Sequence, residues 1–199
     1  MKIGLFFGSF NPVHTGHMVL ANYMLEFTDL DRIWFVVSPH NPLKKKSSLL
    51  DEKQRLHMVN LAIGDNIKMK ASNIEFKLPQ PSYTINTLTY LKEKYPLNEF
   101  ALIMGEDNLD SFHKWKNYEE ILKHYQLYVY PRQKPLPDGP SGDDLRVKPN
   151  QHQVKLVNAP LMEISSTAIR QAIKEKKDMR YFTSEPVWEY IKAMHFYEK

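Results

Sequence analysis

The sequence predicts an α/β protein in which one parallel sheet is doubly wound by helices. Three observations carry this prediction. Strand and helix signals alternate along the chain, several strands are short apolar runs, and the first strand ends in a loop rich in structure-breaking residues. With 199 residues, 42% of them hydrophobic, the chain can bury one sizeable core, so we expect a single domain over residues 1–199.

The first third of the chain alternates strands and helices. Residues 2–7 read as a buried strand, and residues 16–27 carry apolar side chains at helical spacing. Residues 32–38 are rich in β-forming residues and predict a second strand. Residues 51–64 predict a helix that begins with acidic residues and ends at Gly64.

The alternation continues through the middle of the chain. Residues 67–77 are strand-like, and a helix is expected over residues 82–95, beginning at Ser82 or Thr84. Residues 99–105 form another apolar run, which ends in glycine and predicts a strand. The next helix and strand are expected at residues 117–124 and 126–130.

Residues 131–151 interrupt the pattern because they are rich in Pro, Gly and Asp and poor in apolar residues. We expect a long loop there, since such a length is typical of a mobile or functional segment. A last strand is predicted at 154–159. Two helices, at 164–175 and 184–194, then form a small helical C-terminal part from about residue 163.

The composition limits the classes of function. The sequence has no cysteine, which excludes a disulfide scaffold, a thiolate metal site and a cysteine nucleophile, and favours a cytoplasmic location. No apolar run reaches the roughly 18 residues of a membrane span, and no signal peptide is visible, so no membrane association is expected. The net charge of +4 favours anionic ligands, either phosphorylated small molecules or nucleic acid.

The stretch GSFNPVHTGH, residues 8–17, follows the first predicted strand and so lies at the carboxyl edge of the sheet, where ligands of open α/β sheets bind. His14 and His17 are three residues apart, so both can face one ligand at a helix N-terminus, and phosphate is the natural ligand there. A zinc half-site is the less favoured alternative, because no carboxylate or thiol stands at a spacing that completes it. The phosphate motifs GxxxxGK[ST] and GxGxxG are absent, which excludes ordinary NTPases and dinucleotide oxidoreductases.

A second stretch, ISSTAIR at residues 164–170, places three capping residues at the start of a predicted helix. Ser165, Ser166 and Thr167 precede an apolar periodicity, and Arg170 follows one turn later. Taken alone, this segment is explained equally well by helix capping and by a second anion site.

Together the two stretches closely resemble the two signatures of the HxGH nucleotidyltransferases, and most nearly those of bacterial nicotinate mononucleotide adenylyltransferases. The segments at residues 81–88 and 105–109 and the pair Trp115 and Tyr118 extend the resemblance over nearly the whole chain. It implies a Rossmann-like fold and the transfer of AMP from ATP to nicotinate mononucleotide in NAD biosynthesis. The sequence departs from the family pattern at Phe7, at Asn11, where aspartate is usual, and at residues 131–153.

The resemblance also implies roles for individual residues. His14, His17 and Arg170 would be catalytic, as electrostatic clamps on the phosphates, because the attacking phosphate oxygen is already ionised and needs no general base. Mg²⁺ would accompany ATP, and the sequence offers no predicted metal ligands. ATP and its phosphates would be bound by Gly8, Ser9, Phe10, Lys44, Arg132, Ser165, Ser166 and Thr167. The acceptor would be bound by Tyr83, Thr84, Gly105, Asp107, Trp115 and Tyr118, with Trp115 stacked on the nicotinate ring.

Several alternatives stay open at this point. Nicotinamide mononucleotide differs from the nicotinate acceptor only by an amide in place of a carboxylate. Phosphopantetheine adenylyltransferases resemble the chain in fold and in His17, but threonine normally stands where this chain has His14. A non-catalytic nucleotide sensor or an RNA-binding module is the alternative from another class. The expected partners are ATP and nicotinate mononucleotide, without nucleic acid, and a homo-oligomer is compatible with the sequence.

Overall fold

The computed structural model describes residues 1–39, 49–132 and 153–198 of the chain. Its centre is a six-stranded sheet in the order β3-β2-β1-β4-β5-β6, and every neighbouring pair is parallel. This order confirms the predicted doubly wound, Rossmann-like sheet. The strands are β1 (Lys2–Gly8), β2 (Arg32–Val37), β3 (Met69–Ser72), β4 (Glu99–Gly105), β5 (Gln126–Tyr130) and β6 (Val154–Leu156).

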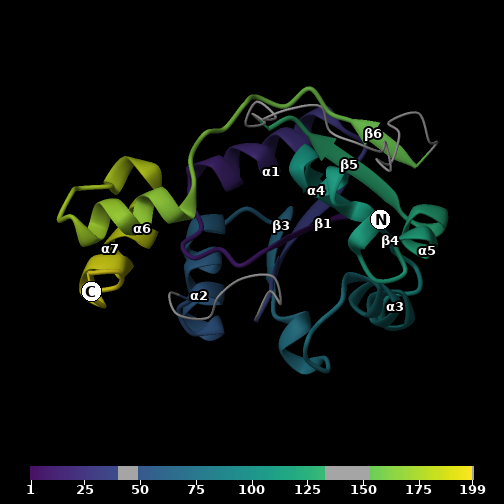
Figure 1. Ribbon diagram of the computed structural model, residues 1–199, viewed down its shortest axis with the longest axis horizontal. Helices are drawn as coiled ribbons and strands as arrows, with labels where there is room; N and C mark the ends of the chain where they lie inside the picture. The colour runs from purple at the N-terminus through teal and green to yellow at the C-terminus, as the bar shows by residue number, and fades with distance from the viewer. Residues whose placement is uncertain (40–48, 133–152, 199) are drawn as a thin grey trace.

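Helices cover both faces of the sheet, and their apolar residues form two core clusters. One cluster joins the sheet to α1, α2, α6 and α7, and the other joins it to α3, α4 and α5. Figure 1 shows α6 and α7 beyond α2, at the end of the molecule opposite α3 and α5. The helices are α1 (Thr15–Phe27), α2 (Glu52–Ile63), α3 (Thr84–Lys94), α4 (Glu106–Asp110), α5 (Tyr118–His124), α6 (Ser166–Lys174) and α7 (Glu185–Ala193). The described ranges also contain the short 3-10 helices η2 (Ile74–Lys77), η3 (Phe112–Lys114) and η4 (Arg180–Phe182).

Two predicted strands are shorter than expected, and one helix was not expected. Of residues 67–77 only β3 is extended, because the chain then turns into η2 and buries Ile74 and Glu75. The last strand stops at Leu156 and not at residue 159, since β6 is an edge strand that pairs with β5 alone. The short helix α4 follows β4 directly.

The C-terminal helices share the core of the sheet. Ile169 of α6 and Val187 and Ile191 of α7 belong to the same buried cluster as Phe35 of β2. This continuity supports the single domain over residues 1–199, which stays a prediction. None of the helices in the described ranges is long and apolar enough to cross a membrane.

The order of the strands fixes where a ligand can bind. The connections from β1 and β4 run toward opposite edges of the sheet, so these two adjacent strands form the switch point at which open α/β sheets bind ligands. The loop that follows β1 and the helix α4 that follows β4 therefore flank one crevice at the carboxyl edge. This placement agrees with the prediction made from residues 8–17.

A buried arginine joins the loops at this edge. Arg55 of α2 is 0% exposed, and its Nε donates to the carbonyl of Leu50 at 2.9 Å. Its Nη1 donates to the carbonyls of Ser9 (2.6 Å) and Ser38 (2.8 Å). Its Nη2 donates to the carbonyl of Pro39 at 3.0 Å. One side chain thus connects the loops after β1 and β2 with the start of α2, a role that the sequence did not predict.

We expect Arg55→Met to destabilise the fold strongly. The variant keeps an apolar stem but leaves up to four part-buried carbonyls without this donor, and each such loss costs about 1–3 kcal/mol when water cannot replace it. The free energy of unfolding from urea denaturation should fall by about 3 kcal/mol or more. Lys53→Met on the exposed side of the same helix is the control and should change it by less than about 0.5 kcal/mol. Equal, small effects of both variants would contradict this role.

Candidate active site

The two signature stretches meet at one loop. Ser166 Oγ, at the start of α6, donates to the carbonyl of Pro12 at 2.9 Å, and Arg170 Nη1 donates to the carbonyl of Asn11 at 2.7 Å. His14 is the residue that precedes α1. The N-termini of α1 and α6 therefore lie at the same loop, and each carries free N–H groups and a partial positive charge.

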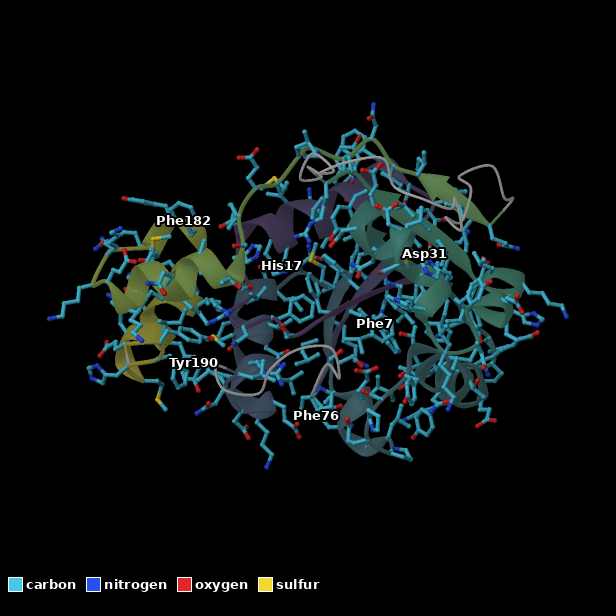
Figure 2. The ribbon with its side chains drawn as sticks, viewed as in Figure 1. Phe7, His17, Asp31, Phe76, Phe182 and Tyr190 are labelled. Atoms are coloured by element: carbon cyan, nitrogen blue, oxygen red, sulfur yellow. The ribbon has the colours of Figure 1, made fainter. Side chains whose placement is uncertain are left out.

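The two histidines form a stacked pair. Their ring centroids lie 3.7 Å apart at an angle of 28°, and His14 is only 6% exposed. The main-chain N–H of His14 donates to His17 Nδ1 at 3.2 Å, so the neutral His17 ring carries its proton on Nε2. Gly16 packs closely against this pair, because a Cβ there would lie 3.1 Å from His14 Nδ1. Figure 2 shows His17 at the start of α1, between the sheet and the C-terminal helices.

His14 is neutral near pH 7. Burial, and then the positive charge of Arg132, lower the pKa of His14 to about 4. This corrects the expectation that both histidines bring positive charge to the site. Near His14, positive charge lies on Arg132 and Arg170, and the N-termini of α1 and α6 carry partial positive charge.

A cavity of about 470 Å³ lies beside the start of α6, a volume within the range of roughly 300–1,000 Å³ that is typical of small-molecule sites. Two of its lining residues form an ion pair, with Arg132 Nη1 3.1 Å from Asp107 Oδ2. A Cβ at Gly105 would contact the Asp107 carboxylate and displace this side chain. A second cavity of about 20 Å³, lined by His14, His17 and Arg132 among others, has room for about one water molecule. The larger cavity is lined by Asp107, Arg132, Leu161, Met162, Glu163, Ile164 and Ser165.

Two predicted acceptor residues, Gly105 and Asp107, lie next to residues that were predicted to bind ATP. Asp107 lines the cavity together with Ser165 and Arg132, both predicted to bind ATP. Gly105 is adjacent, since a Cβ on it would lie 3.0 Å from Arg132 Cδ. The structure therefore groups Gly105 and Asp107 with the residues predicted to bind ATP.

The other predicted acceptor residues form a separate group. Tyr83 precedes α3 and Thr84 begins it, while Tyr118 is the first residue of α5. The Trp115 ring is half-buried, with its centroid 5.0 Å from that of Phe112, and the Tyr118 ring lies 6.2 Å from Phe112. None of the four predicted residues lines either cavity described above.

The remaining residues predicted to bind ATP differ in what their side chains and main chains contact. Gly8 offers its carbonyl to the main-chain N–H of Ser38 at 2.9 Å. The Phe10 ring is buried in the core, so only its main chain can face a ligand. Ser165 Oγ accepts from the N–H of Ala168 at 3.1 Å, which is plain helix capping. The carbonyl of Ser9 accepts a hydrogen bond from Arg55. Thr167 Oγ1 accepts one from Arg170 Nη2 at 3.3 Å. Lys44 lies outside the described residues.

Two residues near the acceptor group were missed by the sequence analysis. Lys116 places its ammonium 4.5 Å from the centroid of the Tyr83 ring, which links the segment before α5 to the start of α3. Glu75 is 3% exposed, and its carboxylate accepts from Thr87 Oγ1 at 2.9 Å and from Ser82 Oγ at 3.3 Å. Burial raises the pKa of Glu75. No local pattern marks either residue, because both contacts join segments that are separate in the sequence.

The chain is similar in sequence to known proteins over most of its length. The family model described as cytidylyltransferase-like matches residues 5–172. A Flavobacterium johnsoniae protein described as a probable nicotinate-nucleotide adenylyltransferase is 58% identical over 199 residues, which cover all of both chains. A Bacteroides thetaiotaomicron protein with the same description is 46% identical over 192 residues, covering 96% of this chain and 91% of its own.

Solved structures are similar in fold. The nicotinic acid mononucleotide adenylyltransferase of Plasmodium falciparum, solved in complex with NaAD, superposes with a TM-score of 0.75. The superposition covers 99% of this chain and 97% of that one, at 18% identity. A putative nicotinate-nucleotide adenylyltransferase of Vibrio parahaemolyticus superposes with a TM-score of 0.71 at 22% identity, covering 100% of this chain and 96% of its own.

The burial of His14 predicts a specific dependence of stability on pH. Its pKa is about 4 in the folded protein, against an ordinary value of 6.5 in an unfolded chain, so the unfolded chain binds the extra proton first as pH falls. The contribution of neutral His14 to the free energy of unfolding is complete above pH 6.5. It is lost as the pH falls from 6.5 to 4, by about 3 kcal/mol in total.

We therefore expect the free energy of unfolding to fall less steeply for His14→Gln than for the native protein when urea denaturation is repeated from pH 7 to pH 4.5. His195→Gln is the control, because the His195 side chain is 78% exposed, and it should follow the native profile. Parallel profiles for His14→Gln and the native protein would contradict the neutral, buried state of His14.

Proposed function

The chain belongs to the cytidylyltransferase-like family and, within it, to the nicotinate-nucleotide adenylyltransferases, and from this premise we propose that it transfers AMP from ATP to nicotinate mononucleotide. The products are nicotinate adenine dinucleotide and pyrophosphate, a step of NAD biosynthesis. The family predicted from the two signature stretches is confirmed by the full-length relatives. The observation that carries the mechanism is the contact of Ser166 and Arg170 with the loop that precedes His14.

The proposed reaction is an in-line displacement at the α-phosphorus of ATP. A phosphate oxygen of the mononucleotide forms the new bond, and the bond to the bridging oxygen of pyrophosphate breaks, so that pyrophosphate leaves with the electron pair. The second pKa of a phosphate monoester is about 6, so the nucleophile is already ionised near pH 7 and no general base is required. The protein accelerates such a step by aligning the reactants and by stabilising the charge on the phosphates.

The proposal gives the residues of the two signatures the role of holding the phosphates. His17 Nε2–H and the His14 ring donate hydrogen bonds, and Arg170 adds a permanent positive charge. The free N–H groups at the starts of α1 and α6 bind phosphate oxygens, as helix N-termini commonly do. Arg132 and Lys44 are further cations assigned to the phosphates of ATP by the family resemblance.

Mg²⁺ is proposed to enter with ATP. The ion keeps several waters and takes most of its other oxygen ligands from phosphates, so it requires few ligands from the protein. Within residues 1–39, 49–132 and 153–198 there is no group of three or more His, Asp or Glu that could hold a metal. When bound, Mg²⁺ neutralises charge on the phosphates of ATP.

Each substrate is proposed to use one of the two groups of residues. The nucleoside of ATP would occupy the cavity beside α6, with Asp107 accepting from a ribose hydroxyl after its ion pair with Arg132 opens. The nicotinate ring would stack on Trp115, with its carboxylate near the main-chain N–H groups of Thr84 and Tyr118, as the family resemblance implies. One chain supplies all of these residues, and a homo-oligomer is compatible with that. The proposed location is the cytoplasm, which the cysteine-free sequence supports.

Pyrophosphate release tests the reaction. The protein is incubated with ATP and Mg²⁺ and with nicotinate mononucleotide, nicotinamide mononucleotide or phosphopantetheine in parallel. We expect strong preference for the nicotinate acceptor. A preference for either of the others would keep the chemistry and change the acceptor, whereas ATP binding without release in any assay would overturn the reaction in favour of a nucleotide sensor.

We expect Lys116 to favour the charged acceptor. Its ammonium lies at the start of α3, where the proposal places the carboxylate, and an exposed cation gives a modest preference of about 1 kcal/mol. Lys116→Gln should lower kcat/KM for nicotinate mononucleotide about 5-fold and leave the value for nicotinamide mononucleotide within about twofold. Lys114→Gln, an exposed neighbour two residues away, should change neither value. Equal losses of kcat/KM for both acceptors would show that Lys116 does not distinguish the carboxylate from the amide.

A further inference from the structure

The last residues of the described chain reach back to the loop that carries the histidines. Tyr197 Oη donates to Asn11 Oδ1 at 2.8 Å, although 186 positions separate the two residues. Tyr197 has a φ of 68°, in the left-handed region, and its side chain is half-buried. Its pKa is raised by burial, which keeps the hydroxyl protonated as a donor.

Asn11 is the point at which three distant segments contact this loop. It is 3% exposed, and its Oδ1 also accepts from the main-chain N–H of Leu50 at 3.3 Å. Its carbonyl accepts from Arg170 of α6 at 2.7 Å. The positive charges of Arg170 and Arg55 lie close enough to the Tyr197 hydroxyl to oppose the rise of its pKa. The hydroxyl therefore lies near the arginines that hydrogen-bond to this part of the molecule.

The loop needs such contacts because it has no regular secondary structure between β1 and α1. Phe10 adopts a φ of 45° with its ring buried, a backbone conformation that a bulky residue holds only when its surroundings impose it. Only Pro12 and Val13 stand between Asn11 and His14 in the chain. A small displacement at Asn11 therefore reaches the stacked histidines, and misplacement of a reacting group by about 1 Å can cost about 100-fold in rate.

We propose that Tyr197 is a positioning residue for the reaction. Its hydroxyl connects the C-terminal helical part to Asn11 and so fixes the loop in the conformation that presents His14 and His17 to the phosphates. The inference rests on the proposed function, because its measure is the rate of that reaction. It assigns the C-terminal part a role in setting the geometry of the site, in addition to its share of the core.

Tyr197→Phe tests the proposal, because it removes only the hydroxyl. We expect kcat to fall about tenfold, with KM for nicotinate mononucleotide within about twofold and the melting temperature nearly unchanged. Tyr190→Phe is the matched control. The Tyr190 ring packs against Phe196 with centroids 5.4 Å apart, and Tyr190 lies in the same C-terminal part (Figure 2). Within the described residues its hydroxyl has no hydrogen bond, so this variant should keep the native kcat.

A double-mutant cycle separates positioning from a general loss of folded protein. Asn11→Ala removes the acceptor, so Tyr197→Phe should have little further effect on kcat in that background. Independent, multiplicative losses would overturn the proposal, as would an unchanged kcat of Tyr197→Phe or equal losses in Tyr197→Phe and Tyr190→Phe. Absence of turnover in the native protein would instead overturn the proposed function.

Discussion

The hydrogen bonds of the buried Arg55 guanidinium are the interaction on which the geometry of the site depends. A parallel sheet delivers its loops to the carboxyl edge with main-chain carbonyls that the strands do not pair. Arg55 satisfies carbonyls of Ser9, Ser38, Pro39 and Leu50 at once, so the loops after β1 and β2 become one unit with the start of α2. Burial of a charge is tolerated only when it is well hydrogen-bonded, and the planar fork of arginine allows four such bonds where the single ammonium of lysine would not.

On this frame, the proposed phosphate side of the site relies more on oriented dipoles than on charge at His14. His14 is buried against His17 and close enough to Arg132 for that charge to act on it, which keeps it neutral. The N-termini of α1 and α6 supply N–H groups that need no reorganisation when charge develops. Their convergence depends on contacts of α6 with the Asn11 and Pro12 carbonyls, and the hydroxyl of Tyr197 adds a third contact from the same C-terminal part.

The sequence predicted well wherever the determining interactions are local. Apolar runs and helical periodicity located most strands and helices, and the capping residue Ser165 marked the start of α6. The sequence predicted poorly where contacts between distant segments determine the structure. The strand expected over residues 67–77 gives way to η2, where the buried Glu75 meets Thr87 of α3. The ion pair of Asp107 with Arg132, beside Ser165, was not predicted either, because it follows from the register of β4 and β5, which brings Gly105 next to Tyr130.

By itself, the sequence determined the class of fold, the order of its elements and the chemistry of the two signature stretches, because spacing along a helix or strand fixes which neighbouring side chains share a face. Only the tertiary structure decided which groups converge on the loop before α1. The neutral state of His14, the carbonyl contacts of Arg55 and the bond from Tyr197 to Asn11 all arise from burial and from contacts between remote segments. Such contacts leave no periodic trace in the chain, since they depend on how complete elements pack against one another.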